Sequence, residues 1–516
     1  MEVALAPSTR SPAVGVKVNF TKGAASPGSS RLRGLVIAVA SSTGSLAGSD
    51  GTIKQAVSGA DDFATYLGPA SPGHLFAKAL FVECPTAYLD LVTALAPTGN
   101  TATATVTFDD TSPVTADRTV TVTIAGRPIT ITWRVGEDDI TAATKLVAAA
   151  NGQDQDLPVS AANGGGANPA VVFSFKQPGL AGNDVKIYLD VADGAGGSIA
   201  LSGTASDHMT GGTTEATLTN ALLAVSETTY DYIALLTSNA DVGSASATSG
   251  PGKVKTQLRA KGDGANARLQ QAIFGATGTT TLVKTGTAAR NYERLQTTYC
   301  QFGQSLPAEW QGAEMGARMR EVAINPVKNR IKMVYRATLY GARDRVNDTL
   351  TAAEEEDLLF AGVSPVGYSS AGDPLPLRPI TEYFKDGSGN ADDRVLDTSR
   401  VDGIFAVVND LAVALPQEYA GQNISPDLPN GEEELPPDTT EIGEVKEFVI
   451  QRLFYWARKR GVLLVNRVLE AIGTPEAPGG LIVEIDPTDP SQVDLVVPMK
   501  TTPPLAKFSL VANQVQ

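Results

Sequence analysis

The stretch LPAEWQGAEMGARMREVAINPVKNRIKMVYRATLYG at residues 306–341 decides the fold. Pro307 and Glu309 predict that a helix begins here, because proline fits the first helical turn and a carboxylate stabilises the positive end of the helix dipole. The pair Asn325-Pro326 ends this helix, since proline cannot continue it, and the basic residues that follow predict a strand. Three small residues would let the helix pack closely on a neighbour: Ala313, Gly316 and Ala317.

A second helix is predicted in LTAAEEEDLLFAGVSPV at residues 350–366. Thr351 is the expected N-cap, and Glu354 three residues later completes a capping box. Gly362 ends this helix, and the side chains expected to be buried before it are Leu358, Leu359 and Phe360. Helix, strand and helix in this order predict α/β architecture, and the pattern by itself predicts no chemistry.

The composition describes a globular chain of several domains. Its 516 residues predict two to four domains, and 42% hydrophobic with 19% charged residues is a globular balance. The net charge of −15 argues against a general nucleic-acid binder, which needs an excess of Lys and Arg. There is no run of about 18 apolar residues and no signal-peptide pattern at the start, so we expect a soluble product made in a cytoplasm.

Few residues could carry out chemistry. The two histidines, His74 and His208, and the two cysteines, Cys84 and Cys300, do not supply the spaced pairs of a four-ligand zinc site. The cysteines could be bridged within one subunit or between subunits, or remain free thiols. Nucleophile-elbow, Walker and HExxH motifs are all missing. We therefore expect no enzyme activity, no catalytic residue, no cofactor and no metal.

The chain begins with an arm and a first core segment. Residues 1–30 are rich in Pro, Gly and Ser, and residues 14–20 alternate between apolar and polar side chains as a single strand does. Such a strand has to add to the edge of another sheet. Residues 31–95 form the first core segment, with a buried strand and two helices, the second of which Pro85 interrupts before residues 89–95.

The next segment, residues 96–212, predicts an inserted, mostly antiparallel β-domain with one helix. Its strands are expected at residues 103–108, 119–124, 129–133, 171–175 and 185–189, and its helix at 139–150. The core then resumes over residues 213–345. Its predicted elements are helices at 217–225 and 252–263 and strands at 230–237, 269–274 and 280–283.

The last domain covers residues 346–490, with a strand predicted at 397–405 and an acidic, proline-rich loop at 416–440. The helix predicted at 441–472 carries six basic residues against four acidic ones, an excess that stands out in a chain of net charge −15. Residues 491–516 are the second arm. Further strands are expected at 481–485, 493–497 and 505–511.

The run of P-x-E-W, small-residue helix, N-P, basic strand and L-L-x-x-G-V-S-P resembles the core of the tail sheath proteins of contractile bacteriophages. The strand that begins at Tyr230 is similar to the one by which sheath proteins re-enter their core after an inserted domain. The resemblance implies an α+β or α/β multidomain fold. This fold has an interrupted α/β core, an inserted β-domain that faces outward, and strand-bearing arms at both ends.

The resemblance also implies a function. Sheath proteins form stacked hexameric rings around a tail tube and contract to drive the tube through the host cell envelope for genome delivery. The chain would belong to the virion tail and assemble in the host cytoplasm. Its partners would be further copies of itself, the tail tube protein, and the baseplate and tail terminator proteins. No direct contact with nucleic acid and no membrane insertion are expected.

Two sets of site residues follow from the resemblance. The residues expected to exchange strands between subunits are Val14, Val16, Val18, Phe20, Leu505, Phe508 and Leu510. The residues expected to bind the tube are Arg452, Arg458, Lys459 and Arg460, although a basic helix that simply faces solvent is an alternative. Two other functions stay open, the sheath of a headless contractile injection particle (a tailocin) and a β-rich surface adhesin.

Overall fold

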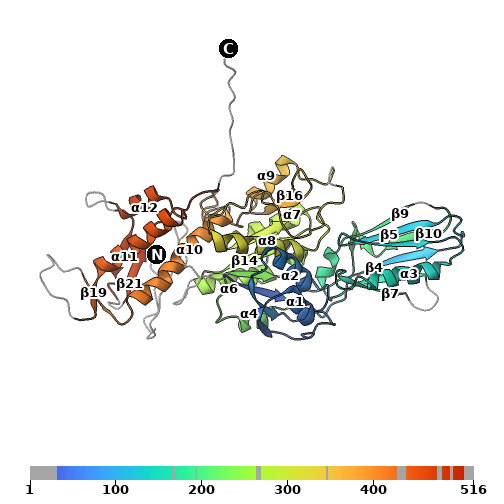
Figure 1. Cartoon of the computed structure of the whole chain (residues 1–516), viewed down its shortest axis with the longest axis horizontal. Helices are drawn as coiled ribbons and strands as arrows, with labels where there is room; N and C mark the ends of the chain where they lie inside the picture. The colour runs from blue at the N-terminus through green and yellow to red at the C-terminus, as the bar shows by residue number, and fades with distance from the viewer. Residues whose placement is uncertain are drawn as a thin grey trace, which may run out of the picture.

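A computed structural model describes residues 32–164, 169–192, 194–262, 269–344, 347–426, 437–473, 479–488 and 492–504. The molecule is elongated and has three parts in a row (Figure 1). We call them the β unit (residues 103–209), the central unit (residues 33–93 and 219–376) and the helical unit (residues 398–504). The fold is therefore a mixed α/β arrangement with several sheets.

The central unit is built on one sheet of eight strands in the order β17-β16-β15-β14-β13-β1-β3-β2. Neighbours from β16 to β3 run parallel, and the edge strands β2 and β17 are antiparallel. The unbroken apolar run in β1 is buried on both faces, as is usual in a parallel sheet. The strands are β1 (Arg33–Ala38), β2 (Ile53–Val57), β3 (Tyr88–Thr93), β13 (Tyr232–Leu235), β14 (Gln271–Ala276), β15 (Leu295–Tyr299), β16 (Ser364–Tyr368) and β17 (Pro374–Pro376).

Helices cover both faces of this sheet. One face packs on α1 (Ala60–Leu67), α2 (Pro72–Glu83) and α8 (Pro307–Ile324), through side chains such as Phe76 and Met315. The other face packs on a second set, through side chains such as Leu258 and Leu358. That set is α4 (Thr219–Ala224), α5 (Asn239–Val242), α6 (Gly250–Gly262), α7 (Thr280–Arg290) and α9 (Ala352–Phe360).

The β unit contains two larger antiparallel sheets, β10-β4-β8-β7 and β6-β5-β9, together with the two-stranded sheet β11-β12 and one α-helix. Phe108 and Trp133 meet edge to face in its core, with ring centroids 5.5 Å apart. Residues 103–108, 119–124, 129–133 and 171–175 form strands as their alternation predicts. The elements are β4 (Thr103–Asp109), β5 (Arg118–Ile124), β6 (Arg127–Trp133), α3 (Asp139–Asn151), β7 (Val159–Asn163), β8 (Ala170–Phe175), β9 (Ile187–Ala192), β10 (Ser198–Ser202), β11 (Thr204–Ala205) and β12 (His208–Met209).

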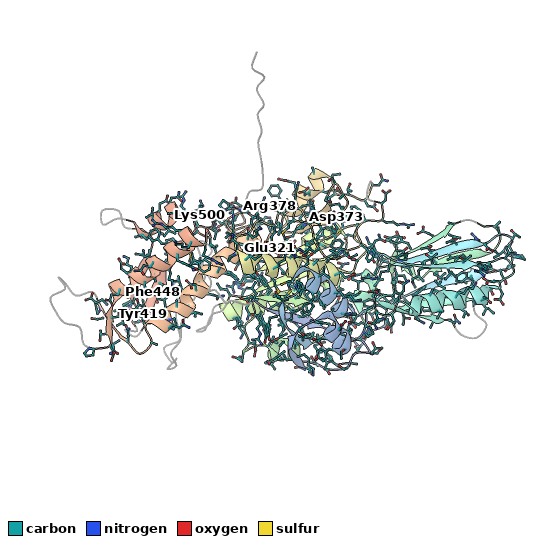
Figure 2. The ribbon with its side chains drawn as sticks, in the orientation of Figure 1. Glu321, Asp373, Arg378, Tyr419, Phe448 and Lys500 are labelled. Atoms are coloured by element: carbon teal, nitrogen blue, oxygen red, sulfur yellow. The ribbon has the colours of Figure 1, made fainter. Side chains whose placement is uncertain are left out.

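The helical unit packs α10 against α11 through Val407, Leu411, Val449 and Leu453. Tyr419 and Phe448 lie side by side at its outer end (Figure 2), with ring centroids 5.8 Å apart. Its helices are α10 (Thr398–Glu418), α11 (Ile442–Phe454) with a π-helical turn at Tyr455–Lys459, and α12 (Val465–Ile472). Its strands are β18 (Asn423–Ser425), β19 (Thr439–Glu441), β20 (Ile482–Ile485) and β21 (Val493–Val496).

The predicted strand after Asn325 is wrong, because the residues between Pro326 and Asp344 form no strand in the structure. Their backbone is held by a side chain instead. The buried carboxylate of Glu83 accepts the N–H groups of Arg336 and Ala337, the latter at 3.0 Å. An extended segment whose donors are satisfied in this way does not need a neighbouring strand.

Three predicted elements change type. Residues 280–283 begin α7, because the Thr279 hydroxyl caps the helix there. Residues 397–405 lead into α10, whose buried Val401, Ile404, Phe405 and Val407 follow helical spacing. After Pro85 the chain forms the buried strand β3, so α2 does not resume there.

Two further predictions need correction. The helix predicted over 441–472 is broken, because Gly461 has a φ of +65° and separates the π-helical turn from α12. Phe360 was expected to be buried, but it is 68% exposed, whereas Leu358 is fully buried. The first turn of α9 is as predicted, since the Thr351 hydroxyl accepts the N–H of Glu354.

Glycines set the close approach of α2 and α8. A Cβ at Gly312 would lie 2.3 Å from the carbonyl oxygen of Phe76, and one at Gly316 would lie 2.6 Å from that of Leu80. We expect Gly312→Ala to lower the free energy of unfolding by about 1–3 kcal/mol, although alanine is the better helix former by about 1 kcal/mol. Thermal and denaturant unfolding measure this, and Gly387→Ala, where nothing lies within 4 Å, is the control. Equal stability of the two variants would contradict it.

Candidate functional site

The buried helix α8 holds the charged side chains that join it to the other two units. Near its first turn, Glu309 forms an ion pair with Arg127 of β6 in the β unit. About two and a half turns later, Arg318 forms an ion pair with Asp402 of α10 in the helical unit. All four side chains are buried. Because an unpaired charge in a protein interior is costly, each pair fixes its unit on the core.

The joint to the β unit is a bidentate contact. Arg127 Nη2 lies 2.7 Å from Glu309 Oε1, and Nη1 lies 3.4 Å from Oε2. The same carboxylate accepts the backbone N–H of Leu306 at 2.9 Å, which caps α8. The ring of Tyr340 lies 5.1 Å from the guanidinium, so the cation is enclosed on that side as well.

The joint to the helical unit is a network around Asp402. Its carboxylate accepts from Arg318 at 2.8 and 3.0 Å, from Gln271 at 2.8 Å and from the Tyr232 hydroxyl at 3.0 Å. Arg330 adds a second cation at 3.3 Å. Burial alone would raise the pKa of Asp402, but the two arginines outweigh it and hold that pKa below its ordinary value.

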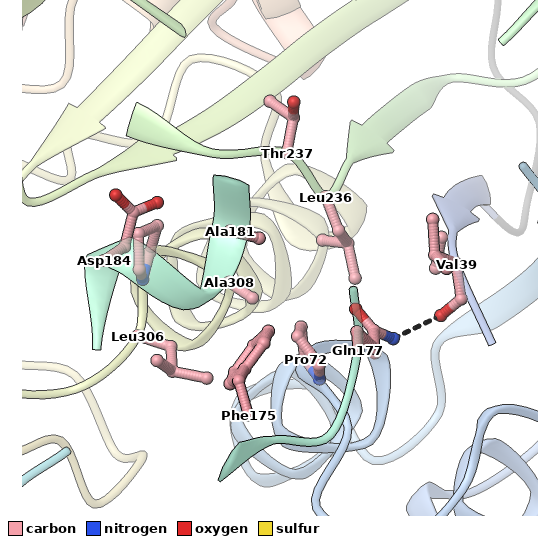
Figure 3. Close-up of a pocket in the computed structure, with 13 residues that line it drawn as sticks. Val39, Pro72, Phe175, Gln177, Ala181, Asp184, Leu236, Thr237, Leu306 and Ala308 are labelled. Carbon is pink, nitrogen blue, oxygen red and sulfur yellow. Dashed lines mark hydrogen bonds between the residues drawn. The ribbon is translucent and has the colours of Figure 1, made fainter. Parts of the chain in front are cut away.

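The crevice where parallel α/β sheets ordinarily bind ligands is filled by the chain itself. The strand order changes direction at β1, so this crevice lies beyond the carboxyl ends of β1 and β13, at Val39 and Leu236. Gln177 from the β unit enters it and donates its side-chain N–H to the carbonyl of Val39 at 2.5 Å (Figure 3). The remaining cavity has about 30 Å³, enough for about two water molecules.

Two carboxylates beside the crevice that Gln177 enters are expected to make the stability of this contact depend on pH. Burial raises the pKa of Asp184 to about 7 and that of Glu215 to about 7, and both contact the turn at Ser238 and Asn239. When the pKa of a carboxyl group is higher in the folded state than in the unfolded state, protonation of that group stabilises the fold. The stabilisation is fully present below the ordinary carboxyl pKa of about 4. We expect it to be lost as the pH rises through about 7.

Limited proteolysis and hydrogen exchange of residues 175–185 between pH 5 and pH 8 measure this effect. Exchange and cleavage are expected to accelerate toward pH 8. Asp184→Asn combined with Glu215→Gln, which keeps both side chains neutral at every pH, should flatten most of the change. Protection that increases with pH would contradict the prediction.

The histidines and cysteines have structural roles. His74 Nδ1 accepts the backbone N–H of Ala70 at 2.8 Å, and burial lowers the pKa of His74 to about 4. Burial also lowers the pKa of His208. Cys84 and Cys300 are buried free thiols with no disulfide between them. Within the ranges that the structure describes, no three His, Cys, Asp or Glu residues are grouped to hold a metal ion.

The four predicted tube-binding residues lie in the last turn of α11 and directly after it. Arg452 is half-buried and lies 3.6 Å from Asp410. Arg458 and Lys459 of the π-helical turn and Arg460, which follows it, are exposed. Arg458 lies over the ring of Phe454 at 4.6 Å. Among described residues, these three exposed cations have no carboxylate within 4 Å. They therefore form one cationic surface, whereas Arg452 belongs to the packing of α10 on α11.

The strand-exchange residues cannot be placed in the same way. All seven, from Val14 to Phe20 and from Leu505 to Leu510, lie outside the described residues. The structure does show a candidate acceptor. Strands β20 and β21 form an antiparallel hairpin, and within the described ranges neither outer edge pairs with a third strand.

Sequence reasoning missed the joints between the units. For the joint to the helical unit, the sequence held one signal. Arg318 lies among small and apolar residues of its helix, where its charge requires a buried partner. The partners of Arg318 and Glu309 come from α10 and β6, which are 84 and 182 residues away. In the described part of the chain, no helix is both long and apolar enough to cross a membrane.

Comparison with solved structures finds sheath tail proteins. The chain is similar to the sheath tail protein of Desulfitobacterium hafniense at 13% identity and a TM-score of 0.42, covering 95% of this chain and 100% of that one. It is similar to the sheath tail protein of Listeria innocua at 12% identity and a TM-score of 0.43, covering 90% of each chain. It is also similar to a chain of the anti-feeding prophage baseplate, at 14% identity and a TM-score of 0.32. This match covers 51% of this chain and 64% of that one.

No protein-family model and no curated protein sequence matches the chain. Two of these three solved structures are named sheath tail proteins, the class that the sequence motifs resemble.

Proposed function

We propose that this chain is the sheath subunit of a contractile tail. It polymerises as stacked hexameric rings around a tail tube and contracts to drive the tube through the host cell envelope. In this proposal the chain belongs to a virion tail that assembles in the host cytoplasm and meets baseplate and terminator proteins at its ends. A head-to-tail contact that does not close into a ring generates a helical assembly of this kind.

The open hairpin β20–β21 is the observation that carries the proposal. A two-stranded hairpin is marginal on its own, and its unpaired edges are ready acceptors for further strands. The chain has two strand-like ends to offer, at residues 14–20 and 505–511. Each added hydrogen bond is worth on the order of 1 kcal/mol net, so two strands from neighbouring subunits contribute several kcal/mol and keep the assembly linked while its subunits move.

We assign each segment of the chain a role in the assembly. Residues 31–95 and 213–345 form the core, 96–212 the outward-facing inserted domain, and 346–490 the tube-facing domain, which contributes β16 and β17 to the central sheet. Residues 1–30 and 491–516 are the linking arms. Contraction is then a change between two packings of the same linked subunits.

Negative-stain electron microscopy of the purified chain tests the proposal. Striated hollow tubes that disappear when residues 1–22 are deleted would support it. A deletion of residues 505–516 should also abolish the tubes, because it removes the other strand. Dispersed particles, even with a tube protein present as template, would overturn the sheath function and favour the adhesin interpretation.

The exposed cations of the π-helical turn are proposed to bind an acidic tail tube. Exposed ion pairs are weak and sensitive to salt, which suits a contact that must release during contraction. We expect Arg458→Glu with Lys459→Glu to give empty or prematurely contracted sheaths by electron microscopy. Lys253→Glu with Arg259→Glu on α6 makes the same charge change elsewhere and should have little effect. Normal extended tails from the first variant would refute the tube contact.

A further inference from the structure

A strip of exposed positive charge lies beside the last turn of α8. Lys328, Lys332 and Arg336, which we call the basic strip, are all exposed. Among the described residues, the side-chain cations of Lys332 and Arg336 have no carboxylate oxygen within 4 Å, and that of Lys328 has only Glu321 at 3.9 Å. In a chain of net charge −15, three such cations in nine residues form an unusual local excess.

The packing of the segment keeps these cations on the surface. Its buried side chains alternate with its exposed ones, since Tyr335 and Ala337 face the core while Val334 and Arg336 face outward. The segment lies along α8, because Arg320 contacts the sulfur of Met333 at 3.9 Å. Apolar surface accompanies the charges, with Val334 40% exposed and Ile324 of α8 68% exposed. The strip therefore presents cations together with exposed apolar side chains.

The chain contains one segment that matches this surface. Residues 427–436, DLPNGEEELP, hold four carboxylates and no cation, and a leucine lies on each side of the three consecutive glutamates. The strip combines cations with exposed apolar side chains, and the sequence of the segment combines carboxylates with leucines. This is the kind of complementarity that selects a partner.

The segment cannot easily reach the strip of its own chain. It leaves from β18 and returns to β19 at the outer end of α10, where the Tyr419 hydroxyl donates to the carbonyl of Glu444 at 3.3 Å. The strip lies at the other end of α10, because Arg330 donates to the Thr398 hydroxyl at 2.5 Å. Figure 2 shows Tyr419 in the outer part of the helical unit and Glu321, the neighbour of Lys328, in the central unit.

The lengths of the two elements agree with this separation. Helix α10 has 21 residues and is about 31 Å long at 1.5 Å per residue. A closed loop between β18 and β19 extends its backbone at most about 22 Å from its base. We propose that the basic strip of one copy binds the acidic segment 427–436 of a second copy. This rests on the proposed assembly, in which many copies lie side by side.

Peptide binding tests the contact without any need for assembly. A fluorescent peptide of residues 425–438 is expected to bind the full chain with an affinity that falls as salt is added. Lys332→Glu with Arg336→Glu should weaken it on the order of tenfold. Arg259→Glu with Lys385→Glu, two exposed cations outside the strip, should not. Equal binding to both variants would overturn the proposal even if the chain forms tubes.

Cross-linking identifies the copy that supplies the segment. Assemblies made from equal amounts of ¹⁴N- and ¹⁵N-labelled chain are treated with a carbodiimide, which joins carboxylates directly to amines. Mixed-isotope links between Glu432–Glu434 and Lys328 or Lys332 are expected. Same-isotope links alone, or links from these glutamates to Lys459 instead, would overturn the proposal. Failure to assemble would refute the proposed function, whereas assembly without these links refutes only this inference.

Discussion

Asp402→Ala is expected to lower the free energy of unfolding by about 3–5 kcal/mol, the usual cost of leaving a buried partner charge uncompensated. The variant leaves Arg318 and Arg330 buried without their carboxylate. It also removes the acceptor for Gln271 and for the Tyr232 hydroxyl. Calorimetry and denaturant unfolding measure the loss, and the transition of the central unit should move to lower temperature.

Two comparisons separate the charge effect from a general effect of truncation. Asp357→Ala breaks the Lys284–Asp357 pair, whose side chains are 32% and 58% exposed, and should cost at most about 1 kcal/mol. Combining Asp402→Leu with Arg318→Met should recover part of the loss, because apolar pairs often replace buried ion pairs without penalty. A cost for Asp402→Ala no larger than that for Asp357→Ala would show that the network does not hold the two units together.

The sequence predicted elements well wherever the pattern was local. The helix from Pro307 to Ile324 with its small residues, the cap at Thr351, and most strands of the β unit are visible as periodicity, capping and turn residues. The errors came where tertiary contacts outweighed local preference. The segment after Asn325 looks like a strand because buried and exposed side chains alternate, but the carboxylate of Glu83 takes the place of a neighbouring strand.

The joints show why the candidate site was only partly predictable. The cations near Arg458 could be predicted to be exposed, because they are consecutive and exceed the nearby acids. The pairing of Glu309 with Arg127 could not, since Glu309 already had a local explanation as the carboxylate in the first turn of α8. A residue that satisfies one role locally gives no indication in the sequence of a second partner 182 residues away.

Arg127→Ala is expected to release the β unit from the core. It should lower the free energy that holds the β unit on the central unit by about 3–5 kcal/mol. Glu309 would keep its bond from Leu306 N–H but lose both bonds from the guanidinium. Because Arg127 lies at the first position of β6, the β unit itself should remain folded. Cleavage between the two units during limited proteolysis should therefore accelerate before either unit unfolds.

A second ion pair across the same joint supplies the control. Lys78 and Asp156 are 36% and 61% exposed, at a distance of 2.7 Å, and Lys78→Ala should cost at most about 1 kcal/mol. Arg127→Lys keeps the charge but loses the bidentate geometry, so its effect should fall between the two. Proteolysis of Arg127→Ala at the rate of Lys78→Ala would mean that the apolar contacts around Phe175 and Leu306 hold the β unit without the buried pair.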